Sequence, residues 1–271
     1  MNPIKPLADL VSSTSSEESD SNNEFDVIMD DSQRTLWICS RVVNMNNGSN
    51  NDEGDDSDTT GDTDGDEMAE SRNHNGTAVM SKTALMILAE GAEEMEAVIT
   101  VDVLRRGGVT VTLAGLDGGD AIRCSREVKV VPDKSLANAL AERPQYDAVI
   151  LPGGLEGTER LIKSEVVGRL LKEHEQSGKI IAAICAAPTA FVAHGVALNK
   201  RVTSYPSMKV KIVSAPGGYQ YIEGERVVVD GNVVTSRGPG TAFWFGLSLL
   251  EILTTKDQAQ KVEKGMVLTG Y

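Results

Sequence analysis

The sequence has few cysteines, no surplus of basic charge and no leader of apolar residues, and each of these shortages excludes a class of protein. The three cysteines, Cys39, Cys124 and Cys185, are widely spaced and form no C-x-x-C pair. This argues against a disulfide framework and a structural zinc site. The first ten residues hold no apolar core of signal-peptide length, and the apolar run at 36–39 is too short to span a bilayer. We therefore expect a soluble protein of a reducing compartment, the cytoplasm.

The acidic charge is confined to one end of the chain. The whole chain has 26 Lys and Arg against 40 Asp and Glu, a net charge of −14. Residues 1–80 contain four basic and 18 acidic residues, whereas residues 81–271 contain 22 of each. Neither part offers the excess of Lys and Arg that phosphate neutralisation needs. We therefore expect no sequence-specific binding of nucleic acid.

Residues 1–80 are dominated by Ser, Asn, Asp, Glu, Gly and Thr. Such a composition cannot bury enough apolar surface to offset the entropy of ordering, so we predict a disordered acidic tail. Two apolar islands, at 25–29 and 36–43, are either short elements that order on an unknown protein partner or plain interruptions of a linker. The stretch 56–67 has the spacing of an EF-hand loop, but no amphipathic helix flanks it, and we predict no metal site.

From Lys82 onward, continuous apolar runs alternate with helical patterns. Continuous rather than alternating apolar strands, separated by helices, indicate a parallel sheet covered on both faces. We therefore predict one α/β domain at 81–271, with a mostly parallel sheet and helices on both faces. The predicted strands are 83–89, 109–114, 146–151 and 179–184, with a hairpin at 226–235, and the predicted helices run up to Arg106 and over 165–176, 241–253 and 257–263.

Active sites in open α/β sheets lie beyond the carboxyl ends of the strands. Cys185 directly follows the fourth predicted strand, and small residues and Pro188 follow it, which is the pattern of a nucleophile elbow. The start of a helix there favours the thiolate. The backbone amides of Gly153, Gly154 and Ala186 are candidates to stabilise an oxyanion. The alternative is a buried structural cysteine.

Histidine is scarce, so we expect a carboxylate to handle protons. His74 lies in the tail, His174 on a helix face that we expect to be exposed, and His194 about two and a half helical turns beyond Cys185. None is an evident base for the sulfur. Glu96 follows the first strand, and a water-poor crevice beside a thiolate would push its carboxyl toward the protonated form.

Four motifs carry a family resemblance. They are EGAEEME at 90–96, DAVILPGG at 147–154, AAICAAPTA at 182–190 and TSRGPGT at 235–241. With these motifs in this order, residues 81–271 closely resemble the Parkinson-disease-linked protein deglycase branch of the ThiJ/PfpI family. The resemblance implies a flavodoxin-like homodimer without a cofactor, in which Cys185 is the nucleophile and oxidation sensor and Glu96 bonds its sulfur. It also implies that Tyr205, Arg126 and Pro239 line the site.

The resemblance implies an activity as well. Members of this family are credited with converting methylglyoxal and glyoxal to hydroxy acids, with removing early glyoxal adducts from proteins and nucleotides, and with protection against oxidative stress. A chaperone role and a presence in nucleus and mitochondrion belong to the same expectation. The rival hypothesis is a redox-sensing chaperone or signalling dimer in which turnover is incidental. Both hypotheses predict a reactive Cys185.

The sequence departs from the family pattern at three positions. Tyr205 stands where the family often has a histidine, and tyrosine is a poor base at neutral pH. Val131 replaces a second cysteine of relatives, whereas Cys124 is matched. Ala186, directly after the nucleophile, separates this chain from protease-like relatives, which have histidine there. A role for the missing histidine therefore does not carry over.

Overall fold

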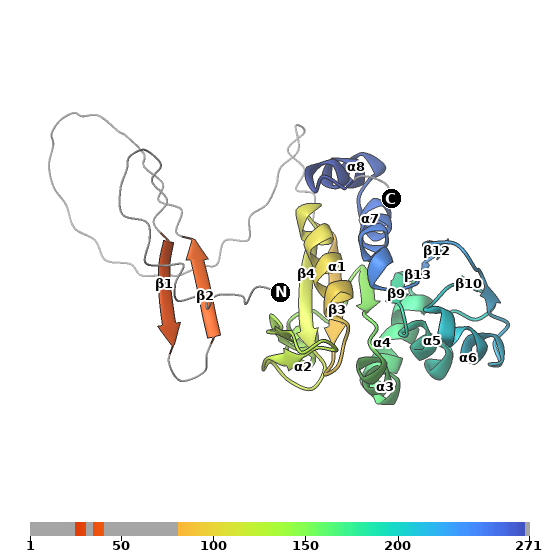
Figure 1. Cartoon of the computed structure of the whole chain (residues 1–271). Helices are drawn as coiled ribbons and strands as arrows, with labels where there is room; N and C mark the ends of the chain where they lie inside the picture. Colours follow the sequence, from red (N-terminus) through yellow and green to blue (C-terminus); the bar gives the residue numbers. More distant parts are fainter. Residues whose placement is uncertain (1–24, 31–34, 41–80, 269–271) are drawn as a thin grey trace, which may run out of the picture. The chain divides into compact units, whose positions relative to one another are not determined.

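The computed structural model describes residues 25–30, 35–40 and 81–268, which belong to two units divided between Asp66 and Glu67. In the first unit, β1 (Phe25–Asp30) pairs with β2 (Thr35–Ser40) as an antiparallel hairpin (Figure 1). The two apolar islands of the sequence thus pair with each other. The disorder predicted for the rest of 1–80 and the EF-hand-like spacing lie outside the described residues, and the partner hypothesis stays a prediction.

The second unit is built on a seven-stranded sheet with the order β12-β13-β9-β8-β3-β4-β7. Neighbouring strands in this sheet run parallel, except for β12 and β13, which form an antiparallel hairpin. The five strands β4-β3-β8-β9-β13 follow the flavodoxin-like order, which confirms the predicted fold class. The bounds are β3 (Thr83–Leu88), β4 (Thr110–Gly115), β7 (Lys134–Ser135), β8 (Ala148–Leu151), β9 (Ile180–Ile184), β12 (Val227–Asp230) and β13 (Val233–Ser236).

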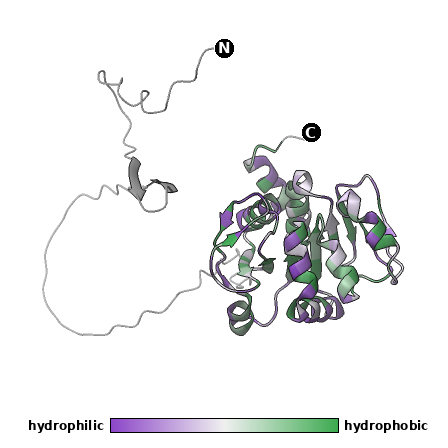
Figure 2. Cartoon of the chain, turned by 60° about the horizontal axis from the view of Figure 1, so that its bottom comes forward, coloured by the Kyte–Doolittle hydropathy of each residue, from purple (hydrophilic) through white to green (hydrophobic). Residues whose placement is uncertain are grey.

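Helices cover both faces of this sheet, as the apolar strands require. Alternate side chains of β3 explain the arrangement, because Met86 belongs to one buried apolar cluster and Leu85 to the other. The first cluster contains side chains of α1 (Glu94–Arg106), α7 (Ala242–Leu253) and α8 (Lys256–Gly265). The second contains side chains of α2 (Leu136–Glu142), α3 (Leu155–Lys163), α4 (Glu165–Gln176), α5 (Pro188–His194) and α6 (Lys209–Val213). The helices carry both hydrophilic and hydrophobic stretches in Figure 2, as two-faced elements do.

The elements that the sequence pattern did not predict are mostly short. They are the helices α2, α3 and α6, the 3-10 turns η2 (Pro206–Met208) and η3 (Pro239–Thr241), and the two-residue strands β5 (Ile122–Arg123), β6 (Lys129–Val130), β7, β10 (Arg201–Val202) and β11 (Gln220–Tyr221). Strands of two residues are too short to show a period in the sequence. β5 pairs antiparallel with β6, and β10 pairs parallel with β11.

One expectation about a side chain was wrong. His174 is buried rather than exposed, and its Nδ1 lies 2.8 Å from the carbonyl oxygen of Leu170. It shares a face of α4 with Val167, Leu170 and Leu171, which lie seven, four and three residues before it. Burial lowers the pKa of the His174 imidazole, so the ring is neutral inside the fold. Across the described part of the chain, every helix is too short or too polar to cross a bilayer.

Candidate active site

A cavity of about 440 Å³ lies beyond the carboxyl ends of the central strands. Loops after β3, β8, β9 and β13 contribute to it, as expected for a doubly wound sheet. Six of the predicted site residues line it: Arg126, Gly154, Cys185, Ala186, Tyr205 and Pro239. The other two, Glu96 and Gly153, are buried behind this lining. The structure thus brings together all eight residues that the sequence singled out, and their chemical roles stay predictions.

Cys185 has a strained backbone at the tip of β9. Its φ of 64° lies in the left-handed region, which costs an ordinary residue about 1–2 kcal/mol. Two backbone hydrogen bonds hold it there: its N–H donates to the carbonyl of Ser236 at 3.0 Å, and its carbonyl accepts from the N–H of Tyr205 at 2.8 Å. The chain then turns into α5, which begins at Pro188. This is the geometry of a nucleophile elbow, with the sulfur presented to the cavity.

Glu96, in the first turn of α1, has a carboxyl group sealed from solvent. Its exposed fraction is 0%, and its Oε2 accepts a 2.8 Å hydrogen bond from the N–H of Gly153. Its Oε1 makes no hydrogen bond within the described residues. A Cβ atom added at Gly153 would lie 2.6 Å from Cβ of Cys185 and 2.7 Å from Glu96 Oε2. Glycine at 153 therefore lets the acid and the thiol approach each other.

One predicted role changes as a result. The amide of Gly153 was expected to stabilise an oxyanion, but it already donates to Glu96. The amides of Gly154 and Ala186 are the ones that act on the sulfur of Cys185. They are therefore the remaining donors for an oxyanion formed at this sulfur.

The acid and the thiol form an electrostatic pair. Burial raises the pKa of Glu96 to about 8, against the lowering effects of the Gly153 amide and the Cys185 thiol, so the carboxyl is mainly protonated at neutral pH. Burial and ionised Glu96 together raise the pKa of the Cys185 thiol to about 12. The amides of Gly154 and Ala186 lower it, but burial outweighs them, so the expected net lowering of the thiol pKa is not found. Because protonation of Glu96 removes its negative charge, the thiolate is favoured most when Glu96 holds a proton.

The remaining predicted residues surround this pair. Tyr205 follows β10 and is half-exposed, and its ring lies 3.4 Å from the position that a Cβ on Gly238 would occupy. Pro239 begins η3 after β13. Neither His174 nor His194 lines the cavity, since Nε2 of His194 lies 3.0 Å from the carbonyl of Leu161 instead. The third histidine, His74, lies outside the described residues.

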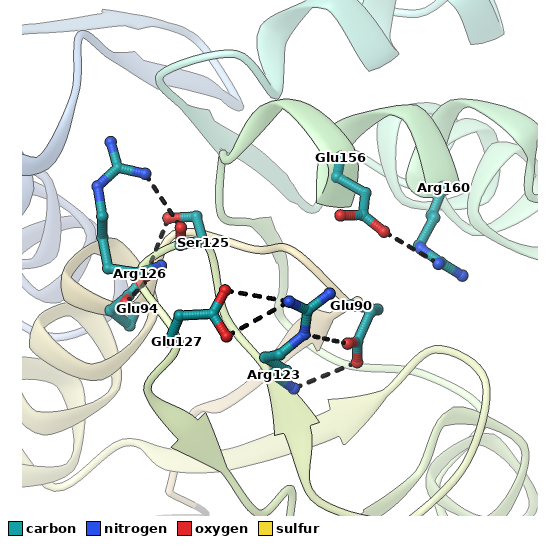
Figure 3. Close-up of polar contacts among 8 residues, drawn as sticks. All are labelled: Glu90, Glu94, Arg123, Ser125, Arg126, Glu127, Glu156 and Arg160. Atoms are coloured by element: carbon teal, nitrogen blue, oxygen red, sulfur yellow. Dashed lines mark hydrogen bonds and ion pairs between the residues drawn. The ribbon is translucent and has the colours of Figure 1, made fainter.

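A turn that the sequence did not single out forms one wall of the cavity. Residues 123–127, between β5 and β6, all line it, and they include the predicted Arg126. Cys124 in this turn is buried, and burial with the nearby Glu94, Glu90 and Glu93 raises the pKa of its thiol to about 11. Figure 3 shows how Glu90, in the loop before α1, and Glu94, the first residue of α1, reach this turn. The only sign of this wall in the sequence was the high density of glutamates at 90–96, whose side chains hold the turn.

The cap of α1 is part of the same acidic loop. The carboxylate of Glu93 accepts a 2.8 Å hydrogen bond from the N–H of Glu96, which starts the helix and orients the Glu96 side chain. Burial raises the pKa of the Glu93 carboxyl. Among the residues that the structure describes, no three His, Cys, Asp or Glu side chains are grouped to hold a metal ion.

Comparisons with known proteins agree with this geometry. A model of the DJ-1/PfpI family matches residues 82–252. Protein dj-1beta of Drosophila melanogaster is 52% identical over 189 residues, covering 70% of this chain and 98% of the relative. Parkinson disease protein 7 homolog of Danio rerio is 51% identical over 187 residues, covering 69% and 97%. Glutathione-independent glyoxalase DJR-1.2 of Caenorhabditis elegans is 39% identical over 188 residues, also covering 69% and 97%.

Solved structures give the same likeness. The crystal structure of Drosophila melanogaster DJ-1beta is similar with a TM-score of 0.67 at 52% identity, covering 70% of this chain and 100% of that one. Oxidized DJ-1 of Toxoplasma gondii is similar with a TM-score of 0.64 at 36% identity, with the same coverage of 70% and 100%.

Proposed function

This chain belongs to the DJ-1/PfpI family, and on that basis we propose that it is a cofactor-free, cysteine-dependent glyoxalase and deglycase. Its substrates are methylglyoxal, glyoxal and their early adducts on proteins and nucleotides. The observation that carries the proposal is the pairing of a strained cysteine with a buried carboxylic acid whose pKa is about 8. A relative at 39% identity is named a glutathione-independent glyoxalase, which supports the same chemistry.

The first step is capture of the aldehyde. The Cys185 thiolate adds to the aldehyde carbon of methylglyoxal, and the new C–S bond gives a hemithioacetal. The electron pair of the C=O bond moves to oxygen, where the amides of Gly154 and Ala186 stabilise the charge. Protonated Glu96 then gives its proton to this oxygen, which leaves Glu96 as a carboxylate.

The second step is an internal transfer of hydrogen. The Glu96 carboxylate removes the proton from the carbon that bears sulfur, and the electron pair moves through the adjacent ketone to form an enediolate. Glu96 returns the proton to the neighbouring carbon, and the hydroxyl proton on the sulfur-bearing carbon passes to the neighbouring oxygen, which gives a lactoyl thioester. Water then hydrolyses the thioester to lactate and free Cys185. One carbon is oxidised and its neighbour is reduced, so the sequence needs no external oxidant or reductant. Early adducts on amines are hemiaminals of the same carbon. The thiolate displaces the amine there as the C–N bond breaks, protonated Glu96 gives its proton to the departing nitrogen, and the same hemithioacetal results.

The test is lactate formation from methylglyoxal without glutathione, using the full chain. We expect Cys185→Ser to abolish turnover, because a serine hydroxyl is a much weaker acid and nucleophile than a thiol. Cys39→Ser makes the same chemical change outside the region matched by the family model, and we expect it to retain wild-type activity. A wild-type chain that forms no more lactate than the Cys185→Ser variant would show that the proposal is wrong.

A second candidate function, redox sensing, rests on the same acid. A protonated Glu96 beside the sulfur can donate a hydrogen bond to an oxygen of a Cys185 sulfinate, which favours that oxidation state. On this hypothesis, protection against oxidative stress comes from a signalling or chaperone dimer that responds to Cys185 oxidation. Mass spectrometry after mild peroxide treatment tests it. The reading fails if other residues gain oxygen while Cys185 does not.

We also propose that the chain forms a homodimer. Several large apolar side chains are exposed on α1, on α7, which packs against α1, and on the segment after β6: Met95, Val98, Val131 and Ile252. Exposed apolar groups that gather into one patch are typical of an interface, and we propose that these four do so. Sedimentation at micromolar concentration should give twice the chain mass, and a monomer at all concentrations would contradict the proposal.

A further inference from the structure

Glu94 is a second buried carboxylate at the start of α1, and the proposed chemistry does not use it. Its exposed fraction is 7%. Its Oε2 accepts a 3.0 Å hydrogen bond from the hydroxyl of Ser125, and its Oε1 accepts a 2.8 Å hydrogen bond from the backbone N–H of Arg126 (Figure 3). Burial raises the pKa of this carboxyl, but these and further backbone hydrogen bonds outweigh burial and lower it. Glu94 is therefore ionised and fully engaged at neutral pH.

The partners of Glu94 belong to the turn that forms a wall of the cavity. In this turn, the N–H of Glu127 donates to the carbonyl of Cys124 at 3.1 Å, and the N–H of Cys124 donates to the carbonyl of Val128 at 2.8 Å. Glu127 has a φ of 69°, a left-handed conformation that a non-glycine residue adopts only when its surroundings hold it. The turn joins two strands of two residues each, so its own sheet pairing is weak.

Backbone and side-chain contacts both hold this turn to the segment around the start of α1. The N–H of Gly91 donates to the carbonyl of Arg123, and the N–H of Ser125 donates to the carbonyl of Ala92, both at 2.8 Å. The buried side-chain contacts are those of Glu94. They are strong, because a hydrogen bond to a charged group is stronger than one between neutral groups. The ion pair of Arg123 with Glu90 at 3.3 Å is an exposed contact with the loop before α1, whereas the pair of Arg123 with Glu127 at 3.0 Å lies within the turn itself. Exposed pairs contribute little to stability, since solvent screens them. Glu94 is therefore the strongest side-chain link between the helix and the cavity wall.

We propose that Glu94 is a positioning residue that fixes the 124–127 turn, and with it Arg126, as the wall facing the aldehyde in front of Cys185. Glu94 and Glu96 project from the same first turn of α1, one to the wall and one to the sulfur. The start of this helix therefore sets both the proton donor and the width of the substrate space. Its kinetic consequence rests on the proposed function, whereas its structural consequence does not.

The first readout separates binding from chemistry. Glu94→Ala should raise KM for methylglyoxal about tenfold while kcat changes less than about twofold, because the wall moves and the Cys185–Glu96 pair does not. Glu94→Gln should restore KM part of the way, since its amide oxygen still accepts from the Arg126 N–H. Glu251→Gln, an exposed carboxylate on α7, is the matched control and should leave both constants at the wild-type values. Unchanged KM in Glu94→Ala, or an equal fall in kcat, would overturn the proposal.

The second readout needs no turnover. Amide hydrogen exchange in Glu94→Ala should increase at least about tenfold more at 124–128 than in β9 and the rest of α1, whose amides report only the change in global stability. Alkylation of Cys185 by iodoacetamide should become about threefold faster because the wall opens. If wild-type protein forms no lactate while these two changes occur, the proposed function fails and the positioning role stands. An increase at 124–128 no larger than that in the rest of the domain would show that Glu94 has no specific hold on the turn.

Discussion

Glu94 and Glu96 lie two positions apart in one helical turn, and both are buried, but burial has opposite outcomes for them. The pKa of Glu94 is lowered, whereas that of Glu96 is raised to about 8. Two things differ: Glu94 keeps an exposed fraction of 7% against 0% for Glu96, so burial costs its charged form less, and the two carboxylates meet different donors. Glu94 receives the Ser125 hydroxyl and the Arg126 amide, while Glu96 receives a single amide from Gly153 and faces a thiol. Burial alone therefore does not decide whether an acid is ionised, because hydrogen-bond donors can outweigh it.

The strongest way to sharpen this contrast is to remove the titrating acid. Glu96→Gln should lower kcat for methylglyoxal on the order of 100-fold or more, because an amide can neither give nor take the proton. KM should change little, since the wall and the sulfur stay in place. Steady-state lactate assays measure both constants, with Glu251→Gln as the control. A Glu96→Gln variant with kcat within threefold of wild type would remove Glu96 from the chemistry.

The stability of Glu96→Gln relative to wild type should increase as the pH rises. The folded pKa of Glu96, about 8, lies above the ordinary value of 4.5, so the folded state keeps a proton that the unfolded chain releases. Wild-type stability therefore falls between these two values, by about 1.4 kcal/mol for each pH unit. We expect the unfolding free energy of Glu96→Gln relative to wild type to rise by about 3 kcal/mol from pH 5 to pH 8. Urea unfolding at several pH values measures it, and a flat difference would contradict the raised pKa.

Glu94 should behave in the opposite way. Its lowered pKa means that its contribution to stability is present above pH 4.5 and is lost as the pH falls through the folded value. Glu94→Gln should therefore destabilise the fold by about 2 kcal/mol at pH 7, the usual size for hydrogen bonds to a charged group. The loss should shrink toward pH 3. A Glu94→Gln variant as stable as wild type at pH 7 would break the comparison.

The smallest effect is expected at the outer edge of the turn. Glu90 pairs with Arg123 at 3.3 Å, and both side chains are at least one-third exposed. Glu90→Gln should therefore cost less than about 1 kcal/mol and leave KM at the wild-type value. Thermal unfolding and the lactate assay measure the two quantities. A loss as large as that of Glu94→Gln would mean that the exposed contacts, not the buried ones, hold the wall.

The sequence predicted the parts of the site that follow strands. Continuous apolar runs placed β3, β8 and β9. Cys185 could be named because it directly follows β9, and Glu96 because it lies in the first turn of the helix that follows β3. The use of the Gly153 amide by Glu96 could not be predicted, because it joins residues 57 positions apart through side-chain geometry. The role of Glu94 was missed for a related reason. Its partners sit between two-residue strands, which leave no periodic signal in the sequence.

The backbone of Cys185 has a consequence for engineering. Glycine adopts a φ of 64° without the penalty that a Cβ atom imposes, so replacing the cysteine by glycine relieves the local strain. A library screened only for thermal tolerance would therefore favour glycine at position 185, whereas a library screened for aldehyde turnover would retain cysteine. The two screens would therefore select different residues at position 185, because the backbone conformation that presents the sulfur is also the strained one.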